Sequence, residues 1–282
     1  MNLRVFGDVD AFLDRTGSTL MAREAEASLL LGVALRLRDG HRYGDEAPFL
    51  ACVEDSSGIA AIAARTPPHN LLLHVERATD AALECLAEHL TDVSEPPPGV
   101  HGERASAERF ARVWSETTGC GHDVTMSQRL YRLTEVSFPF GVPGRFRLAE
   151  SGDADRLVAW TEAFVNEAVG EGPHPDADAL VERLLAGKAL AVWEDGDAVS
   201  MASANRPTPN GIAINLVYTP PESRRRGYAS ACVATLSQRQ LDAGKRFCTL
   251  FTDLANPTSN ALYRRIGFRP VADFAEIRFV TA

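Results

Sequence analysis

One stretch near the C-terminus constrains the fold most, because an apolar segment, an arginine-rich turn and an amphipathic helix follow one another there. The apolar segment runs from Ile212 to Tyr218 and closes at a Pro-Pro pair. Apolar residues then recur at positions i, i+3, i+4 and i+7 from Ala229 to Leu236, which is one face of a helix. Gly244 marks the expected helix end. The sequence therefore predicts a strand, a tight turn and a helix start in this order.

The turn between the strand and the helix has the composition of an anion-binding site. Its residues are Arg224, Arg225, Arg226, Gly227, Tyr228 and Ala229. Free backbone N–H groups and the helix dipole favour an anion at a helix N-terminus, and glycine lets a ligand approach the backbone closely. Guanidinium groups match phosphate oxygens. We predict that the turn holds a pyrophosphate; the alternative is a basic turn that only caps the helix.

The turn differs from the two best-known nucleotide-binding loops. It lacks the Gly-Lys-Ser/Thr ending of an NTP-binding loop and the three-glycine spacing of a dinucleotide fold. It resembles the Arg/Gln-x-x-Gly-x-Gly/Ala signature of the GNAT superfamily of N-acetyltransferases. That resemblance implies that the loop holds the pyrophosphate arm of coenzyme A.

A second motif follows about 30 residues later. Asn256 and Pro257 have the pattern of an N-cap and a first helical position. The string Asn256-x-x-x-Asn260-x-Leu262-Tyr263-x-x-x-Gly267-Phe268 resembles the second half of the coenzyme site in the same superfamily. The resemblance covers roughly residues 145–279.

Composition limits the remaining function classes. The chain has 282 residues, of which 45% are hydrophobic, so it is long enough for two packed cores. Its net charge of −9 disfavours a general nucleic-acid binder. The longest apolar run is too short for a membrane span, and five scattered cysteines without CxxC spacing predict neither disulfides nor a metal site. We expect a cytoplasmic monomer or homodimer that contacts neither membrane nor nucleic acid.

The two halves of the chain resemble each other in sequence at an offset of 140 to 141 residues. A segment from Phe49 to Val75 and a segment from Leu190 to Leu216 each have the pattern of three successive strands, which suits an antiparallel meander. The Pro/Gly-rich passage 137–144 is the expected linker. We therefore predict an α+β fold of two GNAT-like domains, 1–138 and 139–282. Each domain has a mixed, mostly antiparallel central sheet flanked by helices.

The first half departs from the motif where a pyrophosphate would bind. No Gly-x-Gly/Ala turn precedes its corresponding helix, and Glu76 and Asp80 place negative charge there. We expect no coenzyme A site in this half, whose role is then structural or substrate-lining.

The resemblance also implies roles for individual residues of the second half. Leu216, Val217 and Tyr218 occupy the strand edge along which pantetheine runs, and a backbone N–H near Val217 is expected to stabilise the oxyanion. Tyr263 is the expected proton donor to the departing thiolate, or else it packs under the coenzyme. Asn256 is expected to touch the pantetheine arm, to cap the helix, or both. Asn260 has a cofactor-binding or a structural role.

The general base stays open at the level of sequence. Asn215 stands on the strand that often carries a glutamate in this superfamily. Glu162 and Glu167 lie on the helix expected to line the acceptor site, while Asp253 and His174 are further candidates, and each is also an ordinary surface residue.

The sequence as a whole indicates an acyltransferase that moves an acetyl group from acetyl-CoA to a primary amine of a small molecule or peptide, by direct attack in a ternary complex. The alternatives are a non-catalytic acyl-CoA-binding module and an acyltransferase that uses another acyl-CoA or an amino-sugar conjugate.

Overall fold

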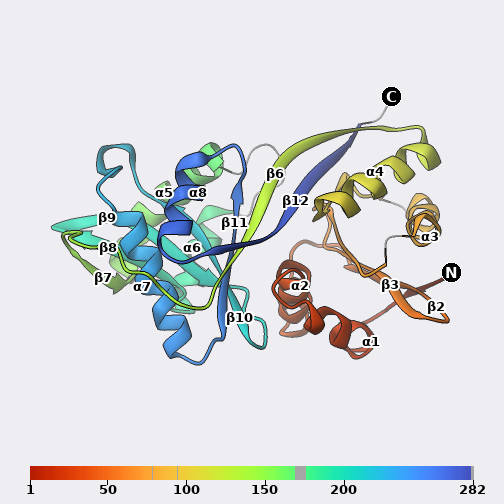
Figure 1. Ribbon diagram of the computed structural model, residues 1–282, viewed down its shortest axis with the longest axis horizontal. Coiled ribbons are helices and arrows are strands. Elements are labelled where there is room, and N and C mark those ends of the chain that lie inside the picture. Colours follow the sequence, from red (N-terminus) through yellow and green to blue (C-terminus); the bar gives the residue numbers. More distant parts are fainter. Residues whose placement is uncertain (78, 94, 169–175, 281–282) are drawn as a thin grey trace. The chain divides into compact units, whose positions relative to one another are not determined.

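The computed structural model describes residues 1–77, 79–93, 95–168 and 176–280. The same order of elements occurs twice along the described chain: strand, two helices, three strands, helix, strand, helix, strand (Figure 1). The first series consists of β1 (Asn2–Val5), α1 (Val9–Ala22), α2 (Ser28–Arg38), β2 (Phe49–Asp55), β3 (Gly58–Arg65), β4 (Leu71–Val75), α3 (Asp80–Thr91), β5 (Gly99–Glu103), α4 (Arg104–Thr118) and β6 (Gly121–Leu133).

The second series repeats this order, with a short 3-10 turn before its first helix and another after its fourth strand. It consists of β7 (Arg145–Leu148), α5 (Ala154–Ala168), α6 (Ala177–Ala186), β8 (Leu190–Asp195), β9 (Asp197–Asn205), β10 (Gly211–Tyr218), α7 (Tyr228–Asp242), β11 (Phe247–Asp253), α8 (Pro257–Arg265) and β12 (Arg269–Val280). The meanders that the sequence predicted are β2–β3–β4 and β8–β9–β10.

The chain forms two compact units whose boundaries differ from the expected division at residues 138 and 139. Unit 1 contains residues 1–130 and 271–282, and unit 2 contains residues 131–270. The physical reason is strand pairing, because β12 ends the second series of elements but pairs antiparallel with β5 of unit 1, from Phe274↔Glu103 to Arg278↔Gly99. The end of β6, conversely, lies in unit 2 beside β11.

Unit 1 is a sheet with a helix pair on each face. Its strand order is β1-β2-β3-β4-β5-β12-β6, with parallel pairing between β4 and β5. Alternate strand residues point to opposite faces, so Leu71 and Leu73 pack with α3 and α4. Leu50 and Ile62 pack on the other face with α1 and α2.

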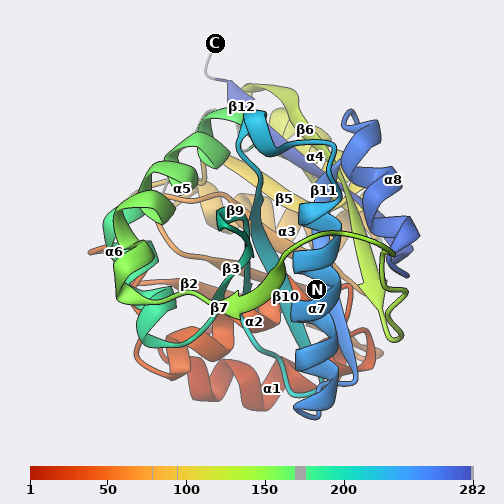
Figure 2. The ribbon, with the colours of Figure 1, turned by 90° about the vertical axis from the view of Figure 1, so that its left-hand side faces the viewer.

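Unit 2 has the same layered arrangement. The order of its strands is β6-β11-β10-β9-β8-β7, and β10 and β11 are parallel. Ile212 and Ile214 pack against α7 and α8 on one face. Leu216 and Tyr218 pack on the opposite face with α5 and α6. Figure 2 shows α5 and α6 in green and α7 in blue on either side of β9 and β10.

The local predictions for unit 2 are confirmed closely. The strand before the turn is β10, the helix after it is α7, and Asn256 caps α8 with Pro257 at the first helical position. The α+β class, with largely antiparallel sheets between helices, is also confirmed. None of the helices in the described ranges has the length and apolar character needed to span a bilayer.

The strand arrangement predicts how the chain responds to division. We expect separate fragments 1–138 and 139–282 to aggregate, and co-expression of both to restore soluble protein. Fragment 1–138 lacks Ala275 and Ile277, which are fully buried in the unit 1 core, and fragment 139–282 carries β12 as an unpaired edge strand. Solubility and size-exclusion chromatography measure the outcome.

Fragment 131–270 is the matched control, because it contains all of unit 2 and none of unit 1. It should be soluble and monodisperse. A soluble, monomeric 139–282 fragment with native circular dichroism would contradict the assignment of β12 to unit 1.

Candidate functional site

The candidate site of unit 2 begins where β10 and β11 separate. Their parallel register extends from Gly211↔Phe247 through Ala213↔Thr249. Both strands continue beyond these pairs, to Tyr218 and Asp253 respectively. The second half of β10 therefore has an edge that no described pairing to β11 covers.

A β-bulge lies on the same part of β10. Its register with β9 shifts between Asn215 and Tyr218, and Leu216 has a φ of +47°. A non-glycine residue in this region costs about 1–3 kcal/mol and persists only where its surroundings fix it. Here the Leu216 side chain is buried among α5 and α6 residues. The described pairings give Leu216 and Val217 no partner on either neighbouring strand, so this backbone is open to a ligand.

Two buried serines fix the ends of the bulge. Ser203 Oγ donates to the Asn215 carbonyl at 3.1 Å, and Ser200 Oγ donates to the Tyr218 carbonyl at 3.0 Å. Both serines have fully buried side chains. The flanking carbonyls are thereby satisfied, and the unpaired backbone is confined to the bulge itself.

The turn after β10 presents a helix N-terminus without a side-chain cap. Gly227 is the N-cap of α7, with a φ of +86°, and no side chain hydrogen-bonds to the cap. A Cβ on Gly227 would meet Val142 Cγ2 at 2.9 Å, so both backbone conformation and space require glycine. The first N–H groups of α7 are thus available to an anion.

The three arginines of the turn do not have equal roles. The side chains of Arg225 and Arg226 are exposed and make no hydrogen bond or ion pair with a described residue. Arg224 is engaged: Nε donates to the Thr219 carbonyl at 2.8 Å, and Nη2 donates to both carboxylate oxygens of Glu167 at 3.0 and 2.7 Å. Its guanidinium also lies 5.6 Å from the centre of the Tyr218 ring.

Tyr228 and Ala229 form the first turn of α7. The Tyr228 side chain is buried in the unit 2 core, and its hydroxyl donates to Asp195 Oδ2 at 2.5 Å. A cofactor-binding role of Tyr228 therefore rests on its backbone N–H and not on its phenol. Ala229 is half-buried.

The two asparagines of the second motif are placed differently. Asn256 is exposed, and its Oδ1 accepts from the Ser259 N–H at 3.0 Å. Asn260 is buried, and its Nδ2 donates to the Asp253 carbonyl at 2.8 Å and to the Asn256 carbonyl at 2.7 Å. Its Oδ1 accepts from the Tyr131 hydroxyl at 2.9 Å. These bonds favour the structural alternative for Asn260 and leave the Asn256 amide group open.

Tyr131 is a residue of this region that sequence reasoning missed. It is fully buried at the end of β6, and its hydroxyl also accepts from Arg264 Nε at 3.2 Å. It lies 129 positions from Asn260, so no local sequence pattern could reveal the hydrogen bond.

Tyr263 lies in the same core, on α8. Its ring packs edge-to-face on Phe268, with centroids 5.9 Å apart. The hydroxyl has no hydrogen-bond partner among the described residues. Its oxygen atom is not fully enclosed by protein. Burial raises the pKa of Tyr263 above its usual range, so the phenol is protonated at neutral pH.

The candidate bases also separate by geometry. Glu162 is exposed and unpaired among described residues, whereas Glu167 is held by Arg224 and lies 3.4 Å from the Tyr218 hydroxyl. Asp253 Oδ1 accepts from the Ala255 N–H at 2.8 Å, which gives it a local capping role. His174 lies outside the described residues.

A polar network surrounds Asn215 on the α5–α6 side of the sheet. Asn215 Nδ2 donates to Asn205 Oδ1 at 2.8 Å, and Arg206 Nη2 donates to Asn215 Oδ1 at 3.1 Å. An amide held by these partners offers no proton acceptor with the basicity of a carboxylate.

In unit 1, the corresponding helix start is filled by the protein's own charges. Arg77 donates to both carboxylate oxygens of Asp55 at 2.8 and 3.1 Å. Asp80, in the first turn of α3, pairs with Arg109 and Arg112. Asp80 and Glu76 thus place carboxylate groups at the start of this helix.

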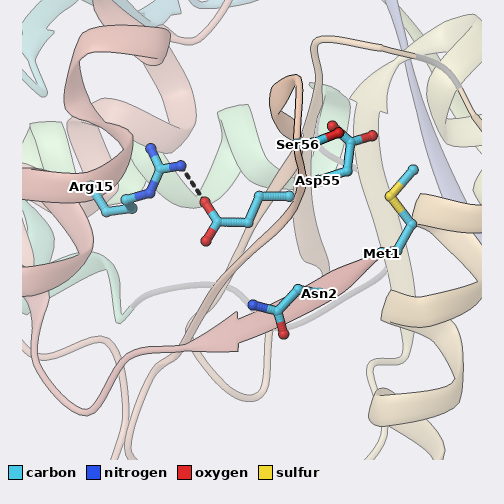
Figure 3. A pocket seen from close by; sticks show the side chains of 6 residues that line it. Met1, Asn2, Arg15, Asp55 and Ser56 are labelled. Atoms are coloured by element: carbon cyan, nitrogen blue, oxygen red, sulfur yellow. Dashed lines mark hydrogen bonds and ion pairs between the residues drawn. The ribbon is translucent and has the colours of Figure 1, made fainter.

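Unit 1 also has an open hollow of about 520 Å³. Figure 3 shows it, with an ion pair between Arg15 and Glu54 on one side. Its lining consists of Met1, Asn2, Arg15, Glu54, Asp55 and Ser56. It belongs to a different unit from the features described above. Within the described ranges, no three His, Cys, Asp or Glu side chains are grouped to hold a metal.

Comparison with known proteins matches part of unit 2 to a family. The model of the acetyltransferase (GNAT) family matches residues 155–268, which contain the bulge, the turn and α8. This segment belongs to the GNAT family. The match places the chain among the acyltransferases. No curated protein matches the chain.

Solved structures share the fold of this chain over nearly its whole length. A GCN5-related N-acetyltransferase from Sphaerobacter thermophilus is 17% identical, with 99% of this chain and 96% of that chain covered and a TM-score of 0.64. A GNAT acetyltransferase from Colwellia psychrerythraea is 10% identical, with complete coverage of both chains and a TM-score of 0.57. At these identities the likeness shows the fold alone.

A third structure is a glucosamine N-acetyltransferase region within a fungal multi-domain β-N-acetylglucosaminidase. It is 14% identical, with 98% of this chain and 38% of that chain covered and a TM-score of 0.55.

The hydrogen bonds of Tyr131 and Tyr263 predict unequal effects of their loss on stability. Tyr131→Phe should lower the free energy of unfolding by about 1–3 kcal/mol, because it leaves the buried Asn260 Oδ1 without its donor. Tyr263→Phe should change it by less than about 0.5 kcal/mol, because that hydroxyl has no partner to lose. Urea denaturation of the two variants measures the difference, and equal losses would contradict the described hydrogen bonding.

Proposed function

We propose that unit 2 transfers an acetyl group from acetyl-CoA to a primary amine by direct attack. The observation that carries this proposal is the bulge on β10, where unpaired backbone at Leu216 and Val217 leads directly into a turn whose helix has no side-chain cap. The bulge provides a strand edge for an amide-containing arm, and the N-terminus of α7 provides N–H donors for a diphosphate.

The residues present fit coenzyme A. The pantetheine arm contains amide groups, which suit the backbone of Leu216 and Val217, outside the described strand pairing, in the manner of an added strand. The N-terminus of α7 and the unpaired guanidinium groups of Arg225 and Arg226 suit the diphosphate. The Nδ2 group of Asn256 is open for the pantetheine arm.

Acetyl-CoA supplies a thioester carbonyl, to which the amine nitrogen bonds while the carbon–sulfur bond breaks. A backbone N–H at Val217 is the proposed donor to the acyl oxygen. Tyr263 is the proposed donor to the leaving sulfur. Since burial raises the pKa of its phenol above that of an ordinary thiol, Tyr263 contributes a hydrogen bond that stabilises the negative charge developing on sulfur. The amine nitrogen, on becoming an amide, releases the proton that the thiolate takes up.

Direct attack is favoured over a covalent acetyl-cysteine route by the state of the nearby thiols. Cys232 on α7 and Cys248 on β11 are buried, which raises the pKa of each to about 12. A thiol that stays protonated is a poor nucleophile. The five cysteines are all free, which suits a reducing compartment such as the cytoplasm.

On the acceptor side, Glu167 and Glu162 are the proposed proton-accepting or ammonium-binding groups. Both lie on α5, which packs against the bulge side of β10. Thiol release from acetyl-CoA with a panel of amines tests the acceptor class, and the panel includes glucosamine because of the fungal structure. Coenzyme binding without thiol release for any amine would favour a non-catalytic binding module instead.

The diphosphate assignment predicts a specific loss of binding. Arg225→Glu should weaken coenzyme A binding at least tenfold in isothermal titration calorimetry, because it reverses a charge at the helix N-terminus. Arg269→Glu is the matched control, since Arg269 is likewise exposed in unit 2 and unpaired among described residues. Equal effects of both variants would reduce the result to net charge and overturn the assignment.

Tyr263→Phe separates chemistry from binding. We expect kcat to fall at least tenfold while the Kd of acetyl-CoA changes less than twofold, because the phenol contributes mainly when charge develops on sulfur. Rapid-quench or steady-state kinetics with an active amine measure kcat, and calorimetry measures Kd. A change in Kd alone would reduce Tyr263 to a packing role.

A further inference from the structure

Arg224 and Glu167 form a link between the donor side and the acceptor side of the proposed site. Arg224 belongs to the turn before α7, and Glu167 lies on the last turn of α5. The two side chains meet through two hydrogen bonds from Nη2 to the carboxylate. The same guanidinium lies against the Tyr218 ring and bonds the Thr219 carbonyl, so the link is anchored at the end of β10.

This arrangement compensates the charge of Glu167. Both of its carboxylate oxygens accept from the Arg224 guanidinium, and Oε1 also lies within reach of the Tyr218 hydroxyl. A carboxylate with a cation already bound attracts an acceptor's ammonium group weakly. Glu162 on the same helix has no such partner among described residues.

Breaking the ion pair between Arg224 and Glu167 costs little free energy. The side chains of Arg224 and Glu167 are 41% and 48% exposed, and exposed ion pairs contribute little because water screens them. A diphosphate carries more charge than a carboxylate and accepts from guanidinium groups in a bidentate fashion. Arg224 stands in the same turn as Arg225 and Arg226, so a diphosphate bound there lies within the region that its side chain can reach.

We propose that coenzyme A binding draws Arg224 from Glu167 to the diphosphate and thereby frees the Glu167 carboxylate for the ammonium group of the acceptor. This inference rests on the proposed function. The acceptor's anionic partner is then available only when the coenzyme is present. Arg224 is then a positioning residue that responds to the coenzyme.

A double-mutant cycle on coenzyme A affinity tests the exchange. The four proteins are the unchanged chain, Glu167→Gln, Arg224→Gln and the double variant, and calorimetry with coenzyme A gives each Kd. Glu167→Gln should tighten binding about two- to fivefold, because Arg224 no longer has to leave a carboxylate. The same substitution should have no effect when residue 224 is glutamine.

Asp155→Asn is the matched control, since it removes a carboxylate charge from the same helix at a position with no proposed role and should leave Kd unchanged within twofold. Unchanged or weaker binding by Glu167→Gln overturns the exchange, because the pair then only supports the loop. An equal gain in Asp155→Asn also overturns it, because net charge then explains the effect. If the unchanged chain binds no coenzyme A, the proposed function itself fails. If the unchanged chain binds coenzyme A but Glu167→Gln does not tighten binding, only the exchange fails.

Discussion

The left-handed backbone of Leu216 is the constraint on which the proposed site depends. It shifts the register of β10 on β9 at the point where β10 also leaves β11. The buried Leu216 side chain fixes this conformation from the α5–α6 side. One locally unfavourable residue therefore opens main-chain groups in the middle of a sheet, where backbone donors and acceptors are otherwise paired.

The packing around the bulge explains how the opening is kept without weakening the unit. Asn260 ties the end of β11 to the start of α8 through two backbone carbonyls, and Tyr131 joins both to β6. The two core clusters of unit 2 lie on opposite faces of the same strands. The strands and helices around the bulge are thus fixed in place, while the backbone of the bulge itself stays unpaired.

The two units have the same order of elements but differ at the corresponding helix start. In both, a helix follows the first of two parallel strands and leads to the second strand. In unit 2 this helix start has Gly227 and two unpaired arginines. In unit 1 it has Asp80, whose charge is matched by Arg109 and Arg112 from α4. The difference lies in a few charged side chains and one glycine, and not in the arrangement of the strands.

The sequence by itself determined the local features of unit 2, because strand periodicity, helix capping and the conformational freedom of glycine act over a few residues. It located β10, the turn at Gly227 and the N-cap Asn256, and it predicted two related halves. Only the tertiary structure decided which unit contains β12, that Arg224 binds Glu167 while Arg225 stays open, and that Asn260 bonds Tyr131. These outcomes depend on contacts between residues tens to more than a hundred positions apart, whose pairing follows from how sheets and helices pack and not from any local pattern.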